Sequence, residues 1–126
     1  MTDLTTQYNL TFDNRSEYLY AHLKADKISV AIIRDYVTKI VAKSAETGKD
    51  RILLHRDIPI VLTEADVFYT VRESLDVFRS NKLALVNPYA DIQKEVEFGM
   101  TVGQNRGANY RVFSNDADAE AWLLKA

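Results

Sequence analysis

The segment Arg51–Pro88 limits the fold of this chain more than any other part of its sequence. Arg51–Asp57 (RILLHRD) and Lys82–Asn87 (KLALVN) are short, largely apolar runs of the kind that form strands. Between them, Thr63–Ser80 has apolar residues at helical spacing, which predicts an amphipathic helix with one buried face. A strand, a helical crossover and a second strand predict a parallel βαβ unit, which is right-handed almost without exception.

The start of the predicted central helix is marked twice. Thr63 is a capping residue with Asp66 three positions later. Leu62 and Val67 occupy the N′ and N4 positions of a hydrophobic staple. Both signals predict that the helix begins directly after Thr63.

The residues before this unit predict a β-hairpin and a helix. Tyr8–Phe12 alternates apolar and polar side chains as a half-buried strand does, Asp13–Ser16 has turn chemistry, and Glu17–Lys24 is a second strand. Ser29 is the predicted cap of the helix that follows, and Gly48 is the residue that ends it.

The residues after the central unit predict two more helices and one strand. Asn87-Pro88 is typical of a helix start, with asparagine as the cap and proline at the first helical position, and Gly107 ends this third helix. Asn109–Phe113 is the last predicted strand, and Asn115–Lys125 is a short final helix.

Two glycines, Gly99 and Gly103, lie on the same face of the third predicted helix as Ile92 and Val96. Glycine costs about 1 kcal/mol relative to alanine in a helix interior, so each needs a reason. Close packing of the helix on the sheet is the simpler explanation, and the approach of a ligand is the alternative.

Together these elements predict one α/β domain over residues 1–126, a β-hairpin followed by four βα units. The sheet is expected to have five strands, of which only Tyr8–Phe12 is antiparallel. One set of alternating strand residues is almost wholly apolar and the other is mixed, so we expect helices mainly on one face and a partly open second face. The apolar set is Leu19, Ala21, Leu23, Ile52, Leu54, Leu83, Leu85, Tyr110 and Val112.

A β-hairpin followed by βα repeats resembles the STAS-type fold of the SpoIIAA-like sporulation anti-sigma-factor antagonists. The similarity is closest to uncharacterised bacterial STAS/SpoIIAA-like proteins. It is carried by Arg111-Val112-Phe113, the acidic segment Asn115–Asp118, and Ala121-Trp122-Leu123. The resemblance implies strands in roughly sequential order, helices that wind as a right-handed superhelix, and a non-catalytic regulatory module that acts through protein–protein contacts.

The antagonists carry an Asp-Ser-Ser-Gly-like motif after the central strand, and a partner kinase phosphorylates its serine. The corresponding turn here is Ile58–Thr63 (IPIVLT), which has neither serine nor glycine. Thr63 is therefore the nearest phosphoacceptor candidate, and an ordinary helix cap is its alternative. Related members also resemble lipid-carrying domains of the CRAL-TRIO type, which implies an alternative function: a carrier of a small apolar or lipid-like ligand held between helices and sheet.

Because successive side chains of a strand point to opposite faces of the sheet, several aromatic and basic side chains are expected on the second, partly open face. Because a monomer rarely exposes a contiguous apolar patch of more than a few hundred Å², a C2 homodimer is expected to cover this face. Folding of residues 1–7 or of the hairpin across it is the alternative. The candidate interaction residues are Tyr18, Tyr20, His22, Leu53, His55, Arg111 and Phe113, with Ala84 and Val86 beside them.

Two further groups of polar residues are candidates for chemistry. His22 and His55, the only histidines, share this face and can begin a metal or acid–base site. No carboxylate lies there at an obvious register, so two half-exposed histidines or an interface pair are the alternatives. Arg106, in the polar loop Gln104–Gly107, is a candidate contact for a carboxylate or phosphate, and a solvated helix end is its alternative.

Composition excludes several classes of site, partner and location. The absence of cysteine excludes disulfides, thiolate metal sites and cysteine nucleophiles. A net charge of −2 without a basic cluster argues against a nucleic-acid partner, and no apolar run is long enough to span a membrane. The first ten residues lack signal-peptide features, so we expect a cytoplasmic protein with residues 1–7 disordered. No nucleophile–base arrangement is present, so neither catalysis nor a cofactor is expected.

Overall fold

The computed structural model describes residues 7–78 and 80–125, except for the side chain of Leu75, so most of segment 1–7 lies outside the described residues. The fold is α/β, with a five-stranded sheet in the order β1-β2-β3-β4-β5. β1 is antiparallel to β2 and all later neighbours are parallel, which confirms the predicted mixed sheet. The elements are β1 (Asn9–Asn14), β2 (Leu19–Lys24), α1 (Val30–Thr47), β3 (Arg51–Asp57), α2 (Glu64–Val77), β4 (Lys82–Val86), the 3₁₀ turn η2 (Ala90–Ile92), α3 (Gln93–Asn105), β5 (Asn109–Phe113) and α4 (Asp116–Leu123).

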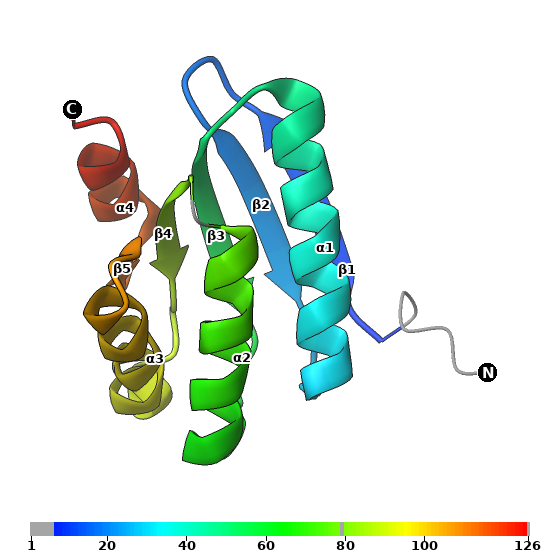
Figure 1. Ribbon diagram of the computed structural model, residues 1–126, viewed down its shortest axis with the longest axis vertical. Helices are drawn as coiled ribbons and strands as arrows, with labels where there is room; N and C mark the ends of the chain where they lie inside the picture. Colours follow the sequence, from blue (N-terminus) through cyan, green and yellow to red (C-terminus); the bar gives the residue numbers. More distant parts are fainter. Residues whose placement is uncertain (1–6, 79, 126) are drawn as a thin grey trace.

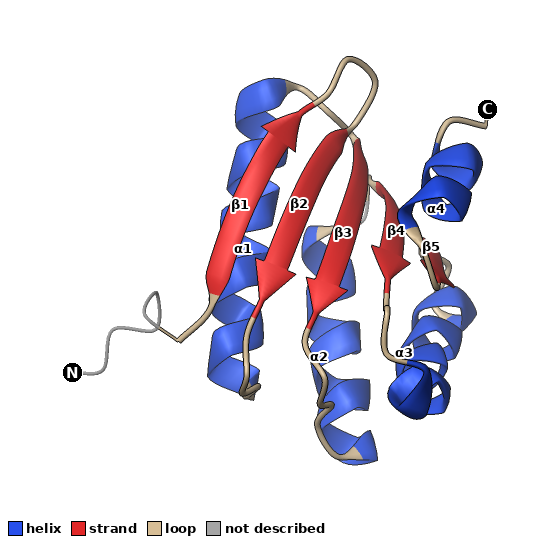
Figure 2. Ribbon diagram, turned by 180° about the vertical axis from the view of Figure 1, so that it is seen from behind, coloured by secondary structure: helices blue, strands red, loops and turns tan. Residues whose placement is uncertain are grey.

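The helices are divided unequally between the two faces of the sheet. α1, α2 and α3 lie side by side on one face (Figure 1), whereas α4 packs on the other face against β3, β4 and β5. From behind, β1 and β2 stand in full view without a helix in front of them (Figure 2). The expectation of helices mainly on one face and a partly open second face is therefore confirmed.

Each face has its own hydrophobic core. The larger core, under α1 to α3, uses the alternating strand residues predicted to be apolar, among them Ala21, Ile52 and Leu85. The smaller core lies under α4, where Leu53, Ala84, Val86, Ala119 and Leu123 are buried. None of the helices that the structure describes is long and apolar enough to cross a membrane.

Three of the predicted helix starts are confirmed at the level of the capping bond. Ser29 accepts a hydrogen bond from the backbone N–H of Ile32, Thr63 accepts one from Asp66, and Asn115 accepts one from Asp118. At the end of α1, Gly48 has φ 70°, the left-handed conformation that ends many helices and that glycine adopts without strain.

The predicted start of the third helix at Asn87-Pro88 is wrong. The buried side chain of Asn87 accepts a hydrogen bond from the N–H of Tyr89 and donates to the carbonyl of Tyr89 and to Gln93 Oε1. These bonds stabilise a turn instead of capping a helix. The chain passes through η2, and α3 begins only at Gln93. Asparagine forms such local turns as readily as it caps helices, so the sequence Asn87-Pro88 alone does not distinguish a turn from a helix start.

The two glycines of α3 are explained by close packing. A Cβ built on Gly103 would lie 2.8 Å from Cδ2 of Tyr110 on β5, and one on Gly99 would lie 3.4 Å from methyl groups of Val67 and Val71 on α2. Gly103 thus lets α3 approach the last strand, and Gly99 lets it approach α2 at the distance of ordinary contact.

Substitution of the two glycines by alanine is expected to separate their roles. Gly103→Ala should lower the free energy of unfolding by about 1–2 kcal/mol, because the clash with the Tyr110 ring exceeds the gain in helix propensity. Gly99→Ala, the matched control, should be about as stable as the wild type. Urea denaturation of both variants measures the difference, and a Gly103→Ala protein more stable than the wild type would contradict this packing.

Candidate functional site beneath helix α2

A cavity of about 130 Å³ lies between the sheet and α1, α2 and α3. Its wall is mainly apolar and draws on all three helices and on β3, β4 and β5. Representative lining residues are Ile33 and Val37 on α1, Val71 on α2, Leu54 on β3, Leu85 on β4 and Val96 on α3.

The cavity exists because α2 stands over the sheet with small side chains on its inner surface. The backbone of α2 approaches α1 and α3 more extensively than it approaches any strand. Thr70 and Ser74 face the cavity, but their hydroxyls donate to the carbonyls of Asp66 and Thr70 in the same helix, at 2.8 and 2.7 Å. Both residues therefore leave space without presenting a free donor.

Of the described residues that line this wall, the one with a cationic side chain is Arg56, near the end of β3. It is only 8% exposed. Its Nη1 donates to the carbonyl of Ile58 at 2.8 Å and its Nη2 to the carbonyl of Ile60 at 2.6 Å, which fixes the guanidinium and the chain that leads to α2. Desolvation by burial lowers the pKa of Arg56, and the nearby Tyr36 and Tyr110 act against that shift.

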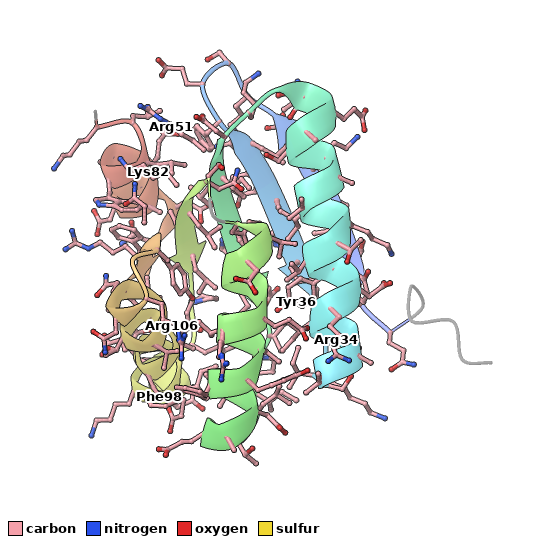
Figure 3. All side chains as sticks on the ribbon, viewed as in Figure 1. Arg34, Tyr36, Arg51, Lys82, Phe98 and Arg106 are labelled. Atoms are coloured by element: carbon pink, nitrogen blue, oxygen red, sulfur yellow. The ribbon has the colours of Figure 1, made fainter. Side chains whose placement is uncertain are left out.

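Two tyrosines complete the polar part of the cavity. Tyr36 extends from α1 into the space between α1 and α2 (Figure 3), and Tyr110 comes from β5. Burial raises the pKa of both phenols, so each hydroxyl keeps its proton at neutral pH. A neutral phenol is a hydrogen-bond donor, so the cavity combines an apolar wall with a cluster of donors around Arg56.

A surface clasp joins α1 and α2 on the outer side of the cavity. Arg34 donates from Nε to Glu73 Oε1 at 2.7 Å and from Nη2 to the hydroxyl of Tyr69 at 2.5 Å. Figure 3 shows Arg34 on α1, close along the helix to Tyr36. Because all three clasp side chains are exposed to a substantial degree, the clasp orients the helices more than it stabilises the fold.

The interaction face predicted from the alternation of the strand residues is largely covered by α4, and only a part of it stays open. Leu53 is fully buried, and Tyr18 is 3% exposed and donates from its hydroxyl to Glu120 of α4 at 2.5 Å. Phe113 packs against Trp122 of α4. The final helix was predicted, but nothing in its sequence states which face it covers.

The two histidines do lie together, on the uncovered part of the same face. Their rings are stacked with centroids 5.0 Å apart, and both side chains are half-buried. A carboxylate from outside the strands reaches them, since Nδ1 of His55 lies 2.7 Å from Oδ1 of Asp116 at the start of α4. Among the described residues, however, no group of three or more ligands could hold a metal ion.

Asp116 ties α4 to the sheet, because the hydroxyl of Tyr20 also donates to its Oδ2 at 2.6 Å. Burial acts to raise the pKa of Asp116, but the hydrogen bonds from Tyr20 and His55 hold it below its ordinary value of 3.8. A carboxylate with a lowered folded pKa contributes stability above its unfolded pKa and loses it as the pH falls through the folded value.

Asp116→Asn is therefore expected to be less stable than the wild type at pH 7, with a deficit that shrinks as the pH falls below 4. The deficit should stay under about 1 kcal/mol, because the carboxylate is partly exposed. Urea denaturation at pH 7, 5 and 3 measures it. A deficit of equal size at all three pH values would mean that the carboxylate charge does not hold α4.

The other residues singled out from the sequence lie apart from the cavity interior. Thr63 is exposed and caps α2, as the alternative to a phosphoacceptor expects. Arg106, at the end of α3, is exposed and its guanidinium lies 5.6 Å from the ring centre of Phe68. Arg111 is exposed and lies over Phe113. None of the three is brought together with Arg56.

Arg56 is the residue that sequence reasoning missed, although a signal was present. Ile52, Leu54 and Arg56 alternate along one face of β3, so an arginine occupies the next position of an apolar series. A charged residue at a buried strand position is uncommon and needs a partner or a purpose.

A scan of the sequence against models of known protein families finds no match, and a search among curated proteins finds no similar sequence.

Proposed function

We propose that this protein binds a small, largely apolar ligand in the cavity beneath α2 and acts as a carrier or sensor without catalysis. The observation that carries the proposal is the cavity of about 130 Å³ in the larger core. An engineered apolar cavity of about 150 Å³ is sufficient for benzene, so the space suits a ligand of that size or the end of a longer chain.

The loose packing at this site supports the proposal. Natural interiors are otherwise close-packed, with few voids larger than a water molecule. A ligand that fills the space recovers contacts with the surrounding side chains and so stabilises the folded state.

This proposal places the carrier function, the alternative from the sequence, ahead of the regulatory module. A partly open core favours a carrier, whereas the module needs a filled core with an exposed aromatic sheet face or edge, and α4 covers most of that face. The SpoIIAA-like resemblance and the cytoplasmic location remain parts of the proposal. The strand order and the three helices on one face support the resemblance.

The test of this function is native mass spectrometry of the protein purified gently from its own host, followed by identification of the released small molecule. The expected result is a one-to-one complex that dissociates on unfolding. A cavity-filled variant prepared in parallel should carry no such molecule. Equal amounts of the same molecule on both proteins would place its site elsewhere and contradict the proposal.

We also propose a protein partner, a second copy of the chain, for the uncovered part of the second face. The half-buried stacked pair His22 and His55, next to Tyr20, supports this second function. His22→Glu should then convert a dimer at high micromolar concentration into a monomer, because two like charges would meet across the two-fold axis. Sedimentation equilibrium measures the change, and a monomeric wild type at that concentration contradicts the dimer.

A further inference from the structure

The guanidinium of Arg56 is a buried charge that no carboxylate in the described part of the chain contacts. Its described partners are the carbonyls of Ile58 and Ile60 and the phenols of Tyr36 and Tyr110. Glu95 is the carboxylate among the described lining residues, and it is exposed. Buried charges in proteins are normally paired, because an unpaired ion in an apolar setting is strongly disfavoured.

The guanidinium also retains donors that point to a ligand. An arginine carries five N–H donors; the two carbonyls account for two of them, and the hydroxyl of Tyr36 is a further hydrogen-bond partner. The same two bonds hold the planar group in a fixed orientation at the cavity wall, so a ligand does not have to immobilise a flexible side chain. Tyr110 is half-buried and lines the same wall, and no hydrogen bond from its hydroxyl is found within residues 7–78 and 80–125.

We infer that the ligand is a small monocarboxylic acid, bound as its carboxylate with the oxygens on Arg56 and its apolar body under α2. This inference rests on the proposed function and adds the chemical class of the ligand. A carboxylate matches the guanidinium fork with two parallel hydrogen bonds and supplies the missing counter-charge. The apolar body, of benzene-like size, fills the space between Val37, Val71 and Val96.

The charge of the cavity favours a carboxylate over a phosphate monoester. One guanidinium neutralises one negative charge, and the described lining residues include no second cationic side chain. A dianionic phosphate would therefore keep an unpaired charge in an apolar site. The competing explanation is that Arg56 serves only to hold the carbonyls of Ile58 and Ile60 in place.

Three probes of similar size separate these explanations: benzoate, its neutral analogue benzamide, and benzene. Isothermal titration of the wild type at pH 7 should show benzoate binding at least tenfold more tightly than benzamide. Arg56→Met keeps an apolar chain of similar length and removes the charge. It should abolish the preference for benzoate while benzene still binds.

Each outcome decides between the proposals. Equal affinity for benzoate and benzamide in the wild type, or a benzoate preference that persists in Arg56→Met, overturns the carboxylate inference. If benzene binds in that case, the proposed function stands without it. If none of the three probes binds, both proposals fail. If Arg56→Met does not fold, two measurements on the wild type decide. One is the comparison of benzoate with benzamide. The other is the affinity for benzoate, which should be lost as the pH falls below about 4, where the acid is protonated.

Discussion

Leu53→Glu is expected to unfold the protein. Leu53 is fully buried between the sheet and α4, in contact with the smaller core formed by Ala84, Val86, Ala119 and Leu123. A carboxylate at this position loses its hydration and finds no cationic partner among the described residues of that core. We expect a loss of ~4 kcal/mol or more, which is most of the ~5–15 kcal/mol that a domain has.

Far-UV circular dichroism and the dispersion of the amide spectrum measure this effect. Leu124→Glu is the control, because Leu124 follows α4 directly and is 36% exposed. That variant should keep the wild-type spectrum. A folded Leu53→Glu protein that changes only its oligomeric state would instead favour a dimer interface that includes Leu53.

Ser74→Leu is expected to stabilise the protein and to block its cavity. Ser74 faces the cavity from α2. Within the described part of the chain, its hydroxyl donates only to the carbonyl of Thr70. Leucine replaces that hydroxyl with an apolar group that extends into the empty space and has a higher helix propensity. The gain in the free energy of unfolding should be about 1–2 kcal/mol, and affinity for benzene should fall at least tenfold.

Thr38→Leu is the matched control for this substitution. Thr38 lies on the exposed side of α1, and its hydroxyl bonds back to the carbonyl of Arg34 at 2.8 Å in the same manner. It gains the same helix propensity without entering the cavity, so benzene affinity should not change. If Ser74→Leu binds benzene as tightly as Thr38→Leu does, the ligand does not occupy the space beneath α2.

Much of the fold could be predicted from the sequence because its determinants are local. The cap at Thr63, the cap at Ser29 and the left-handed Gly48 each depend on a few neighbouring residues. The parallel pairing of β3 and β4 follows from a crossover too long for a hairpin. These features were predicted with their residues, and the structure confirms them.

The parts that failed depend on contacts between distant segments. Asp116 and Tyr20 are far apart in the sequence, and only the position of α4 brings them within hydrogen-bond distance. The same helix buries Leu53, which strand parity alone left exposed. The cavity was likewise not predictable, because the sequence gives the apolar face of α2 but not how far that face stands from the sheet.

An NMR titration of the wild type with benzene, followed through the methyl groups of the valines, tests the ligand site beneath α2 most directly. We expect saturable one-to-one binding, with the largest shift changes at Val37, Val71 and Val96, which line the cavity, and none at Val86 under α4. The Ser74→Leu protein should show no such changes. Absence of saturable shifts in the wild type, or equal shifts in the cavity-filled variant, would contradict a ligand site beneath α2.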